Sequence, residues 1–535
     1  MRKQKPFSIN PKVKENAVYV LLFIFLVVGI IVCNDYGLGW DEKIHREYGL
    51  LNFDYVFHHD LSIYTKGMSG YGVFFEWLCI GFEKTGIISD IRDVMISRHL
   101  INHLLFLLSG FFLYKLVVKV WKNEWLGIIA LLIYLLNPRI YAHSFFNPKD
   151  MPFLSMVVIS IYFSIKTLYS NKYKDYIILG AIYALTINIR IMGLMLPFFF
   201  TIFRIIDFLF NIKKESPKKT AIQFLLLLTT TFLVLYITWP ILWHDPFGKL
   251  ASSFSTMSSF WWRGSVLFMG KFYISNELPW YHILWWMIIT IPLVYWLLTL
   301  AGVVFLVIKI FRNGWRVLND KNFMIPFFFF LCFISPLAII VIMKSVVYDD
   351  WRQVFFVYGG LVLIAAYGVH ELWQRIRGKL GKVLIAALGV TFCFIASQMI
   401  RLHPYEGIYF NDVVYKLKNK REGLRKNYEL DYWGTSFKEA YEYILKTDDR
   451  KHVVVYYNIP PGLFTLDILR PEDRERITFL QKGTDNPDYF VSNYRVHPED
   501  YTFQGNFNVK EVFNIKAYNS RIISVWKITN NSANK

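Results

Sequence analysis

Long apolar runs recur through most of this chain, and they limit its fold more than any other feature. They lie near 17–33, 98–118, 124–138, 151–169, 174–189, 191–210, 220–241, 281–309, 323–343, 353–371 and 382–400. A helix needs about 20 mainly apolar residues to span a bilayer. A soluble chain of 535 residues would instead divide into several cores without such runs. We therefore predict a polytopic α-helical membrane protein with about eleven transmembrane helices. The fifth and sixth spans meet at 188–191, where two spans or one kinked span are both compatible with the sequence.

The chain has a formal charge of +19. The position of its basic residues explains this charge, so it does not indicate a nucleic-acid partner. They gather in every second loop, starting with Lys3 and Lys5 before the first run and Lys115 and Lys119 after the second. An excess of Lys and Arg marks the cytoplasmic side of a membrane protein. We expect a multi-pass protein of the cell (plasma or inner) membrane, with its N-terminus cytoplasmic. The first run is too long for a cleaved signal peptide, so we interpret it as a retained anchor.

Composition divides the chain into two predicted domains, 1–400 in the membrane and 401–535 outside it. The outer loop 34–97 mixes aromatic and charged residues, which is typical of amphipathic helices in the membrane interface. The outer loop 240–280 is rich in Trp and Phe, as in an interfacial belt. After residue 400 we predict a small extracytoplasmic α/β domain, with a helix at 437–445 and strands at 453–457, 489–491 and 521–528.

Polar groups with catalytic potential follow the first span and the third. Asp41 and Glu42 form a carboxylate pair that could accept a proton or hold a cation; the alternative is a solvated loop. Lys149 and Asp150 lie in a turn between prolines. Here the alternative is an ordinary turn with an Asp at a helix N-terminus.

Further basic groups lie at other outer ends of the predicted spans. Arg190 ends the fifth span, where it could mark a site or simply extend to the interface. Arg352, four residues after Tyr348, could bind a phosphate with its planar fork or pair with a local Asp. His403 lies where the chain leaves the membrane. Acids with several bases around them suit a reaction in which an anionic group leaves and a hydroxyl or amine loses a proton. A lipid-linked phosphate donor would satisfy that description.

The order of these motifs resembles that of a known family. The matching segments are Asp41-Glu42, 98–102, 147–153, 239–243, 278–281, 347–352, 403–405 and 429–434. In them the chain resembles the family 39 glycosyltransferases of the GT-C class, which include the protein O-mannosyltransferases and the aminoarabinose transferase that modifies lipid A. The resemblance implies a GT-C-like fold and a hexosyl or pentosyl transferase. It also implies a polyprenyl-phosphate sugar donor, an extracytoplasmic acceptor and inversion at the anomeric carbon.

The resemblance also implies roles for individual residues. Asp41 would be the general base, and Glu42 would orient the acceptor or tune Asp41. The predicted substrate-binding residues are Lys149, Asp150, Arg190, Tyr348, Arg352 and His403, with the two arginines as candidates for the donor phosphate. The loop 240–280 is too short for the β-trefoil domain of the O-mannosyltransferases. This favours the bacterial branch of the family, whose acceptor could be a lipid, a glycan or a protein.

Two other functions remain open from the sequence. A transporter or flippase of lipid-linked sugars is one, although no internal repeat is evident. A non-catalytic membrane scaffold with a partner-binding C-terminal domain is the other. We predict no specific cofactor and no dedicated metal site, because the four cysteines lack metal-ligand spacing. Carboxylates could still hold a divalent cation through water.

Overall fold

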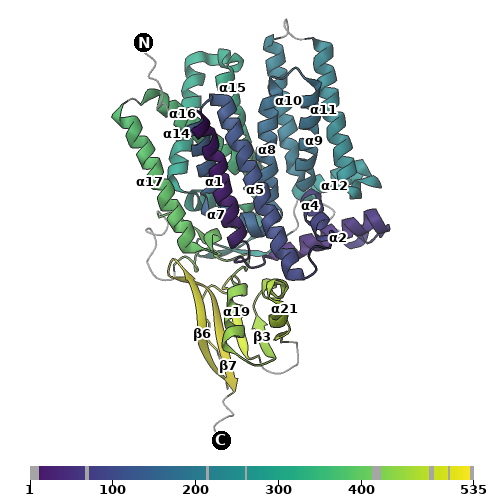
Figure 1. Ribbon diagram of the computed structural model, residues 1–535, viewed down its shortest axis with the longest axis vertical. Helices are drawn as coiled ribbons and strands as arrows, with labels where there is room; N and C mark the ends of the chain where they lie inside the picture. The colour runs from purple at the N-terminus through teal and green to yellow at the C-terminus, as the bar shows by residue number, and fades with distance from the viewer. Residues whose placement is uncertain are drawn as a thin grey trace.

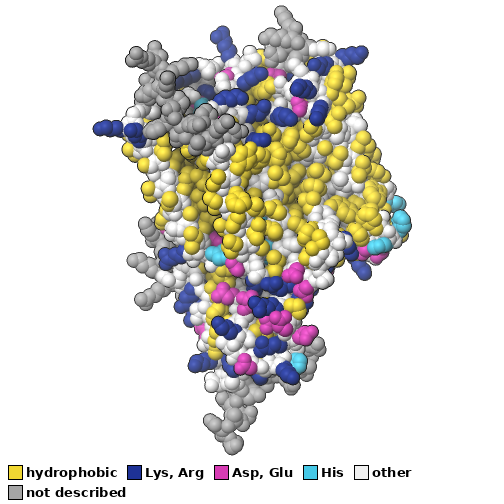
Figure 2. All heavy atoms as spheres, in the orientation of Figure 1, with side chains coloured by type: hydrophobic (Ala, Val, Ile, Leu, Met, Phe, Trp, Pro, Cys, Tyr) yellow, Lys and Arg dark blue, Asp and Glu magenta, His cyan; other side chains and the backbone are white. Residues whose placement is uncertain are grey.

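The computed structural model describes residues 11–66, 71–211, 216–258, 262–376, 378–412, 423–480, 487–503 and 507–530. A bundle of long helices carries a smaller unit with a β-sheet at one end (Figure 1). A broad belt of apolar side chains covers the bundle, and Lys and Arg gather at the end remote from the sheet (Figure 2). Such a belt between two polar ends is typical of a membrane-spanning bundle. Lys3 and Lys5 lie outside the described residues.

Seven helices in the described part of the chain are long and apolar enough to cross a membrane. They are α5 (Ile91–Trp121), α8 (Asp150–Leu168), η1 (Ile191–Leu194) with α10 (Met195–Asn211), α11 (Pro217–Thr238), α14 (Leu293–Asn313) with η4 (Gly314–Asn319), α15 (Lys321–Ile342) and α17 (Lys379–Leu402). The pair α6 (Glu124–Leu135) and α7 (Pro138–Phe146) is bent by 65° and makes an eighth if it is one broken span. The bend follows from Pro138, which cannot continue the hydrogen-bond ladder of α6.

By length and composition alone, seven or eight helices among the described residues thus qualify as spans, compared with the eleven or so predicted. The other predicted spans also fall on helices, but α1 (Pro11–Val32) contributes only a short apolar helix and α9 (Tyr173–Ile189) has 17 residues. The last turns of α16 (Val357–Arg375) are polar. At 188–191 the chain forms two helices, because Arg190 is in an extended conformation between α9 and η1.

The two loops 34–97 and 240–280, predicted to lie outside the membrane, fold into short elements at the end of the bundle that carries the sheet unit (Figure 1). The first contains α2 (Trp40–His58), α3 (Ile63–Lys66) and α4 (Phe74–Glu83). The second contains η2 (Pro240–Trp243), α12 (Pro246–Ser258), the antiparallel hairpin β1 (Ser265–Phe268) and β2 (Lys271–Ile274), and η3 (Ser275–Glu277), followed by α13 (His282–Thr290). α2 extends sideways from the bundle near α12 (Figure 1). Exposed Phe57 on α2 and Phe247 on α12 fit helices that lie in the membrane interface.

The C-terminal unit is α/β, as predicted, and consists of a mixed sheet with a helix packed against it. Its five strands lie in the order β4-β3-β5-β7-β6, with β3 parallel to β4 and β5 and with β7 antiparallel to β5 and β6. The strands are β3 (Val453–Tyr457), β4 (Ile477–Phe479), β5 (Tyr489–Ser492), β6 (Phe507–Ala517) and β7 (Ser520–Asn530). The helices and turns are η6 (Glu406–Ile408), α19 (Phe437–Thr447), α20 (Pro461–Phe464), η7 (Thr465–Ile468) and α21 (Pro471–Arg474). The apolar side of α19, including Phe437, Tyr441 and Ile444, shares a buried core with Val453 and Val525.

Two glycines bring the first outer loop against the sheet unit. A Cβ on Gly37 would lie 2.1 Å from the carbonyl oxygen of Thr435, and one on Gly39 would lie 2.3 Å from Cε3 of Trp433. Any larger side chain would therefore force the two segments apart. Trp433 follows Asp431, whose carboxylate accepts hydrogen bonds from the backbone N–H groups of residues 434–436 and so holds that turn. This close contact places the start of α2 directly against the sheet unit.

Candidate active site

The carboxylates of Asp41 and Glu42 lie in the first turn of α2, where a helix N-terminus favours negative charge. Glu42 Oε1 accepts a hydrogen bond from the Gly39 N–H at 2.8 Å, and its Oε2 lies 2.8 Å from His99 Nε2 on α5. Both oxygens of this buried side chain are thus occupied. Glu42 therefore holds the start of α2 in place, while the Asp41 carboxylate points toward Arg352.

The turn from α7 to α8 is built around Asn147. Its Oδ1 accepts from the Asp150 N–H at 2.9 Å, and its Nδ2 donates to Asp150 Oδ2 at 3.0 Å. Asn102 on α5 donates to the Asn147 carbonyl at 2.9 Å. Pro152 sits in the first turn of α8, where the missing N–H would have no helical partner. The local sequence thereby presents Lys149 and Asp150 at the bundle end that carries Asp41.

The turn before α16 presents a third pair of charges. Asp349 adopts a left-handed conformation with φ of 55°, which Asp tolerates better than most residues. Asp350 Oδ1 accepts from the Arg352 N–H at 2.5 Å at the start of η5 (Arg352–Val354), and Asp350 Oδ2 pairs with Arg139 of α7 at 2.5 Å. Asp350 therefore holds the turn against α7 and leaves Asp349 and Arg352 to face the neighbouring acids.

One guanidinium joins three acids from three parts of the chain. Arg352 Nη1 lies 3.2 Å from Asp150 Oδ2 and 3.6 Å from Asp41 Oδ2. Its Nη2 lies 2.9 Å from Asp349 Oδ2. We call Asp41, Asp150, Asp349 and Arg352 the Arg352 cluster. Because the planar fork of Arg can contact several oxygens at once, Arg352 holds α2, α8 and the turn before α16 together.

Two more cations adjoin the cluster. Arg190 Nη2 pairs with Asp150 Oδ1. Lys149 is buried, and its Nζ lies 2.9 Å from the centroid of the Tyr71 ring. Neither Lys149 Nζ nor Arg190 Nε has a hydrogen-bond partner within the described part of the chain. Burial, reinforced by the charge of Arg190, holds the pKa of Lys149 well below its usual range. An incoming anion would accept hydrogen bonds from both groups and would favour the protonated form of the Lys149 amine.

Asp41 is the member of the cluster that solvent or a substrate can reach. Its side chain is 31% exposed, against 1% for Asp150 and 5% for Asp349. Loss of hydration raises the pKa of Asp41 above its usual range; Arg352 partly offsets this rise, and the other two carboxylates add to it. A carboxylate with a raised pKa is a stronger base than an ordinary Asp, which suits it to proton removal.

The sheet unit supplies a cation that no sequence motif indicated. Arg495 Nη2 pairs with Asp349 Oδ1 at 2.5 Å, and its guanidinium lies 5.3 Å from the centroid of the Trp40 ring. Trp433 packs on Arg352, with the guanidinium carbon 5.1 Å from the ring centroid. Asp349 and Trp433 lie inside motifs used for the family resemblance, but Arg495 lies outside every motif. Only the placement of the sheet unit against the bundle brings it here.

Most of the predicted site residues come together at this end of the bundle. They are Asp41, Lys149, Asp150, Arg190, Tyr348 and Arg352, with the Tyr348 ring 5.1 Å from the Arg352 guanidinium carbon. Glu42 contacts the N-terminus of α2 and His99 instead. His403 contacts a separate pair of acids, with Nδ1 2.8 Å from Glu406 and Nε2 3.0 Å from Asp35. Its contacts link the end of α17 to the first outer loop.

Replacing Arg495 by Ala should destabilise the protein, because Asp349 would remain buried with one of its two cationic partners gone. We expect the free energy of unfolding to fall by about 3 kcal/mol, as for other broken buried pairs. Thermal unfolding in detergent measures this change. Arg521, whose ion pairs are more exposed, provides the control, and Arg521→Ala should cost less than about 1 kcal/mol. Equal losses for the two variants would show that Arg495 does not hold the sheet unit to the bundle.

The His403 contacts should make stability depend on pH. Burial alone would favour the neutral ring, but the carboxylates of Glu406 and Asp35 raise the pKa of His403 to about 8. Since this pKa exceeds the value near 6.5 expected in the unfolded chain, the stabilisation is complete below pH ~6.5 and is lost as the pH rises through about 8. We expect about 2 kcal/mol over this window. Thermal unfolding between pH 6 and 9 tests this, and His403→Gln should flatten the profile. An unchanged slope in that variant would assign the effect to another group.

Comparison with protein families finds one match. Residues 87–243 match the family model described as "Dolichyl-phosphate-mannose-protein mannosyltransferase". This stretch includes α5, the turn with Lys149 and Asp150, and Arg190. The match confirms the resemblance that the motifs indicated. No curated protein sequence matches the chain.

Solved structures similar to this chain include those of two proteins. ArnT from Cupriavidus metallidurans bound to undecaprenyl phosphate is 12% identical, with 95% of this chain and 97% of that chain covered and a TM-score of 0.46. The Archaeoglobus fulgidus oligosaccharyltransferase in the apo form is 11% identical, with 86% of this chain and 64% of that chain covered and a TM-score of 0.48. Its complex with Zn and sulfate is 12% identical, with coverages of 89% and 68% and a TM-score of 0.47.

Proposed function

We propose that this chain is a GT-C glycosyltransferase that moves a sugar from a polyprenyl-phosphate-linked donor to an acceptor outside the cytoplasmic membrane; the family match of residues 87–243 supports this. The description of the matched family names a dolichyl-phosphate-linked sugar, which is a donor of this class. A multi-pass membrane bundle with a charged cluster at one end suits a donor whose tail lies in the bilayer and whose phosphate reaches the surface.

The observation that carries this proposal is the asymmetry of the Arg352 cluster. One acid, Asp41, is partly exposed, whereas Asp150 is buried and paired with Arg190 and Arg352. A transferase needs these two environments together: a reachable base for the acceptor and fixed cations for the leaving phosphate. A turn that merely caps a helix would not require an Arg shared by acids from three elements.

In the proposed reaction Asp41 accepts the proton of an acceptor hydroxyl or amine. The acceptor oxygen or nitrogen then forms a bond to the anomeric carbon while the bond from that carbon to the phosphate oxygen breaks. The electron pair of the broken bond stays with the polyprenyl phosphate. A single displacement of this kind inverts the anomeric configuration. Asp41 would act on the face of the sugar opposite the phosphate, which the cations beside Asp150 would hold.

The proposed phosphate site consists of Lys149, Arg190 and Arg352. Lys149 Nζ and Arg190 Nε have unused donors, and both groups lie next to the cluster. A phosphate placed there would replace the aromatic ring of Tyr71 as the partner of the buried amine and would raise the pKa of Lys149. We keep Glu42 as a residue that positions Asp41 through the start of α2. Tyr348 would line the same site, whereas the contacts of His403 give it a structural role.

The proposed orientation places the sheet unit and the Arg352 cluster outside the cell membrane and the N-terminus inside. Lys and Arg at the remote end of the bundle support it (Figure 2). Within the described residues, no group of three or more His, Cys, Asp or Glu side chains is placed to hold a metal ion. Asp41 and its neighbours could still bind a divalent cation together with the phosphate of the donor.

Reconstitution tests the proposed function. The purified protein in proteoliposomes, given a radiolabelled polyprenyl-phosphate-sugar pool and a membrane extract as acceptor source, should transfer label to the acceptor fraction. Mass spectrometry of glycolipids and glycoproteins from a deletion strain should show the loss of the same product. Movement of the labelled lipid across the bilayer without transfer would favour a flippase. A phenotype that depends on residues 410–535 but not on Asp41 would favour a scaffold.

A further inference from the structure

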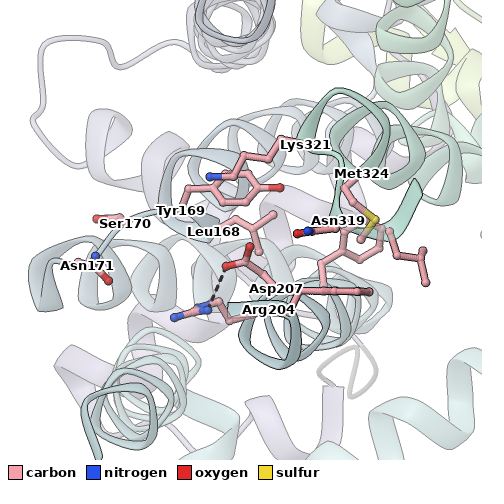
Figure 3. A pocket seen from close by; sticks show the side chains of 12 residues that line it. Leu168, Tyr169, Ser170, Asn171, Arg204, Asp207, Asn319, Lys321 and Met324 are labelled. Carbon is pink, nitrogen blue, oxygen red and sulfur yellow. Dashed lines mark hydrogen bonds and ion pairs between the residues drawn. The ribbon is translucent and has the colours of Figure 1, made fainter. Parts of the chain in front are cut away.

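A cavity of about 280 Å³ lies at the end of the bundle opposite the Arg352 cluster. It is formed by the C-terminal ends of α8 and α10, by η4 and by the start of α15 (Figure 3). Because α8 begins at Asp150 and ends at Leu168, this cavity is separated from the cluster by the length of the helix, about 28 Å. It therefore does not belong to the proposed catalytic site.

One cation that lines the cavity lies unusually deep within a candidate membrane-spanning helix. Arg204 lies inside the candidate span 191–210 and is 1% exposed. An Arg within a membrane segment is costly and marks a functional site by default. Its Nε donates to the Tyr176 hydroxyl at 3.0 Å, and its Nη1 lies 3.3 Å from Asp207 Oδ2. Asp207 offsets part of this charge, and both residues line the cavity (Figure 3).

A second cation lies across the cavity. The amine of Lys321, at the start of α15, lies 3.9 Å from the centroid of the Tyr169 ring. Lys321 is exposed, and its amine contacts no carboxylate in the described part of the chain. Figure 3 shows Lys321 and Arg204 on opposite sides of the Tyr169 and Leu168 side chains. The cavity is thus lined by two cations and one carboxylate.

The remaining wall of the cavity is apolar. Leu168, Phe203, Phe210, Leu318 and Met324 line it, while Ser170, Asn171 and Asn319 add neutral polar groups. A cavity lined both by cations with amide groups and by hydrocarbon fits an amphiphile rather than a free ion. Basic pockets between the ends of membrane helices on the cytoplasmic side suit the phosphate groups of lipids.

We propose that this cavity binds the phosphate headgroup of an anionic phospholipid from the leaflet remote from the sheet unit, with the phosphate against the exposed amine of Lys321. Lys321 supplies a mobile point charge that contacts the phosphate. The buried Arg204, bonded to Tyr176 and Asp207, adds its positive charge from the other side of Tyr169 and Leu168. The apolar wall contacts the glycerol and the first methylene groups of the acyl chains. A phospholipid and a free phosphate ester share the phosphate group. The apolar wall favours the phospholipid, because only the lipid has acyl chains to pack against it.

Native mass spectrometry of the full-length protein in detergent tests this site. The probes are dioleoylphosphatidylglycerol, dioleoylglycerol (which lacks the phosphate) and sn-glycerol 3-phosphate (which lacks the acyl chains). We expect the phospholipid to bind on the order of tenfold more tightly than either of the other two probes. Binding of dioleoylglycerol as tight as that of the phospholipid would overturn phosphate recognition. Equally tight binding of glycerol 3-phosphate would overturn the lipid as occupant.

Variants locate the bound lipid. Lys321→Glu should weaken phospholipid binding on the order of tenfold, and Lys321→Ala on the order of fivefold, because a positive charge is reversed or removed. Arg316 lies at the same end of the bundle but does not line the cavity, so Arg316→Ala serves as the matched control and should leave binding unchanged. Equal losses in Lys321→Ala and Arg316→Ala would overturn the proposal. Sugar transfer by Lys321→Ala at saturating donor should equal that of the wild type, which separates this test from that of the proposed function.

Discussion

Asp41→Asn should reduce kcat for sugar transfer by about 10²–10⁴-fold, the usual contribution of a general base. The amide has nearly the shape of the carboxylate but cannot accept the acceptor proton. Arg352, 3.6 Å from Asp41, keeps its contacts with Asp150 and Asp349, so the fold and donor binding should survive. The measurement is steady-state transfer from a labelled polyprenyl-phosphate sugar, together with equilibrium binding of the donor and thermal unfolding of the variant.

A second readout distinguishes a base from a residue that only shapes the site. Because its surroundings raise the pKa of Asp41, the acid limb of the pH profile of kcat/KM should lie above the value near 4 of an ordinary Asp. Transfer rises as the pH passes this limb, since Asp41 must be deprotonated to act. Asp54 lies on the same helix and pairs with His58, away from the cluster, so Asp54→Asn is the matched control. Undiminished transfer by Asp41→Asn would exclude Asp41 as the base.

Arg352→Lys should lower the rate of sugar transfer nearly as much as removal of the charge. Arg352 contacts three acids with different nitrogens, and a single ammonium cannot reproduce that geometry. We expect transfer to fall by about 10²–10³-fold, as when one fixed donor to a developing negative charge is lost. Arg352→Gln should also lower the free energy of unfolding by about 3–5 kcal/mol, because Asp349 and Asp150 lose a buried partner.

The control for Arg352 uses the same chemical change at a site with one acid. Arg375 pairs with Glu371 through a half-exposed side chain at the other end of α16. Arg375→Lys should therefore leave transfer and stability close to those of the wild type. If Arg352→Lys kept full activity, the fork geometry would be irrelevant. A simple cation near Asp41 would then be enough.

Local sequence was sufficient to predict the turn that carries Lys149 and Asp150 but not the site itself. Asn147 and Pro152 shape the turn of Lys149 and Asp150 through contacts a few residues apart, and Asp350 caps the turn of Arg352 in the same way. Such short-range hydrogen bonds depend on residue type and spacing, which can be seen in one chain. The described residues contain seven or eight helices that qualify as spans by length and composition, fewer than the eleven or so predicted, because an apolar run does not reveal where a helix bends or stops.

The sequence by itself determined that this chain enters a membrane many times, ends in a small α/β domain, and carries its acids and arginines at the helix ends. It did so because hydrophobic run length and periodicity act locally. Only the tertiary structure decided which of those charges meet. Asp41 and Glu42 are neighbours in the chain, yet Asp41 faces Arg352 while Glu42 binds His99, since successive residues of a helix point in different directions. Likewise Arg495 reaches Asp349 because glycines let the sheet unit pack closely on the bundle, a contact between segments about 150 residues apart.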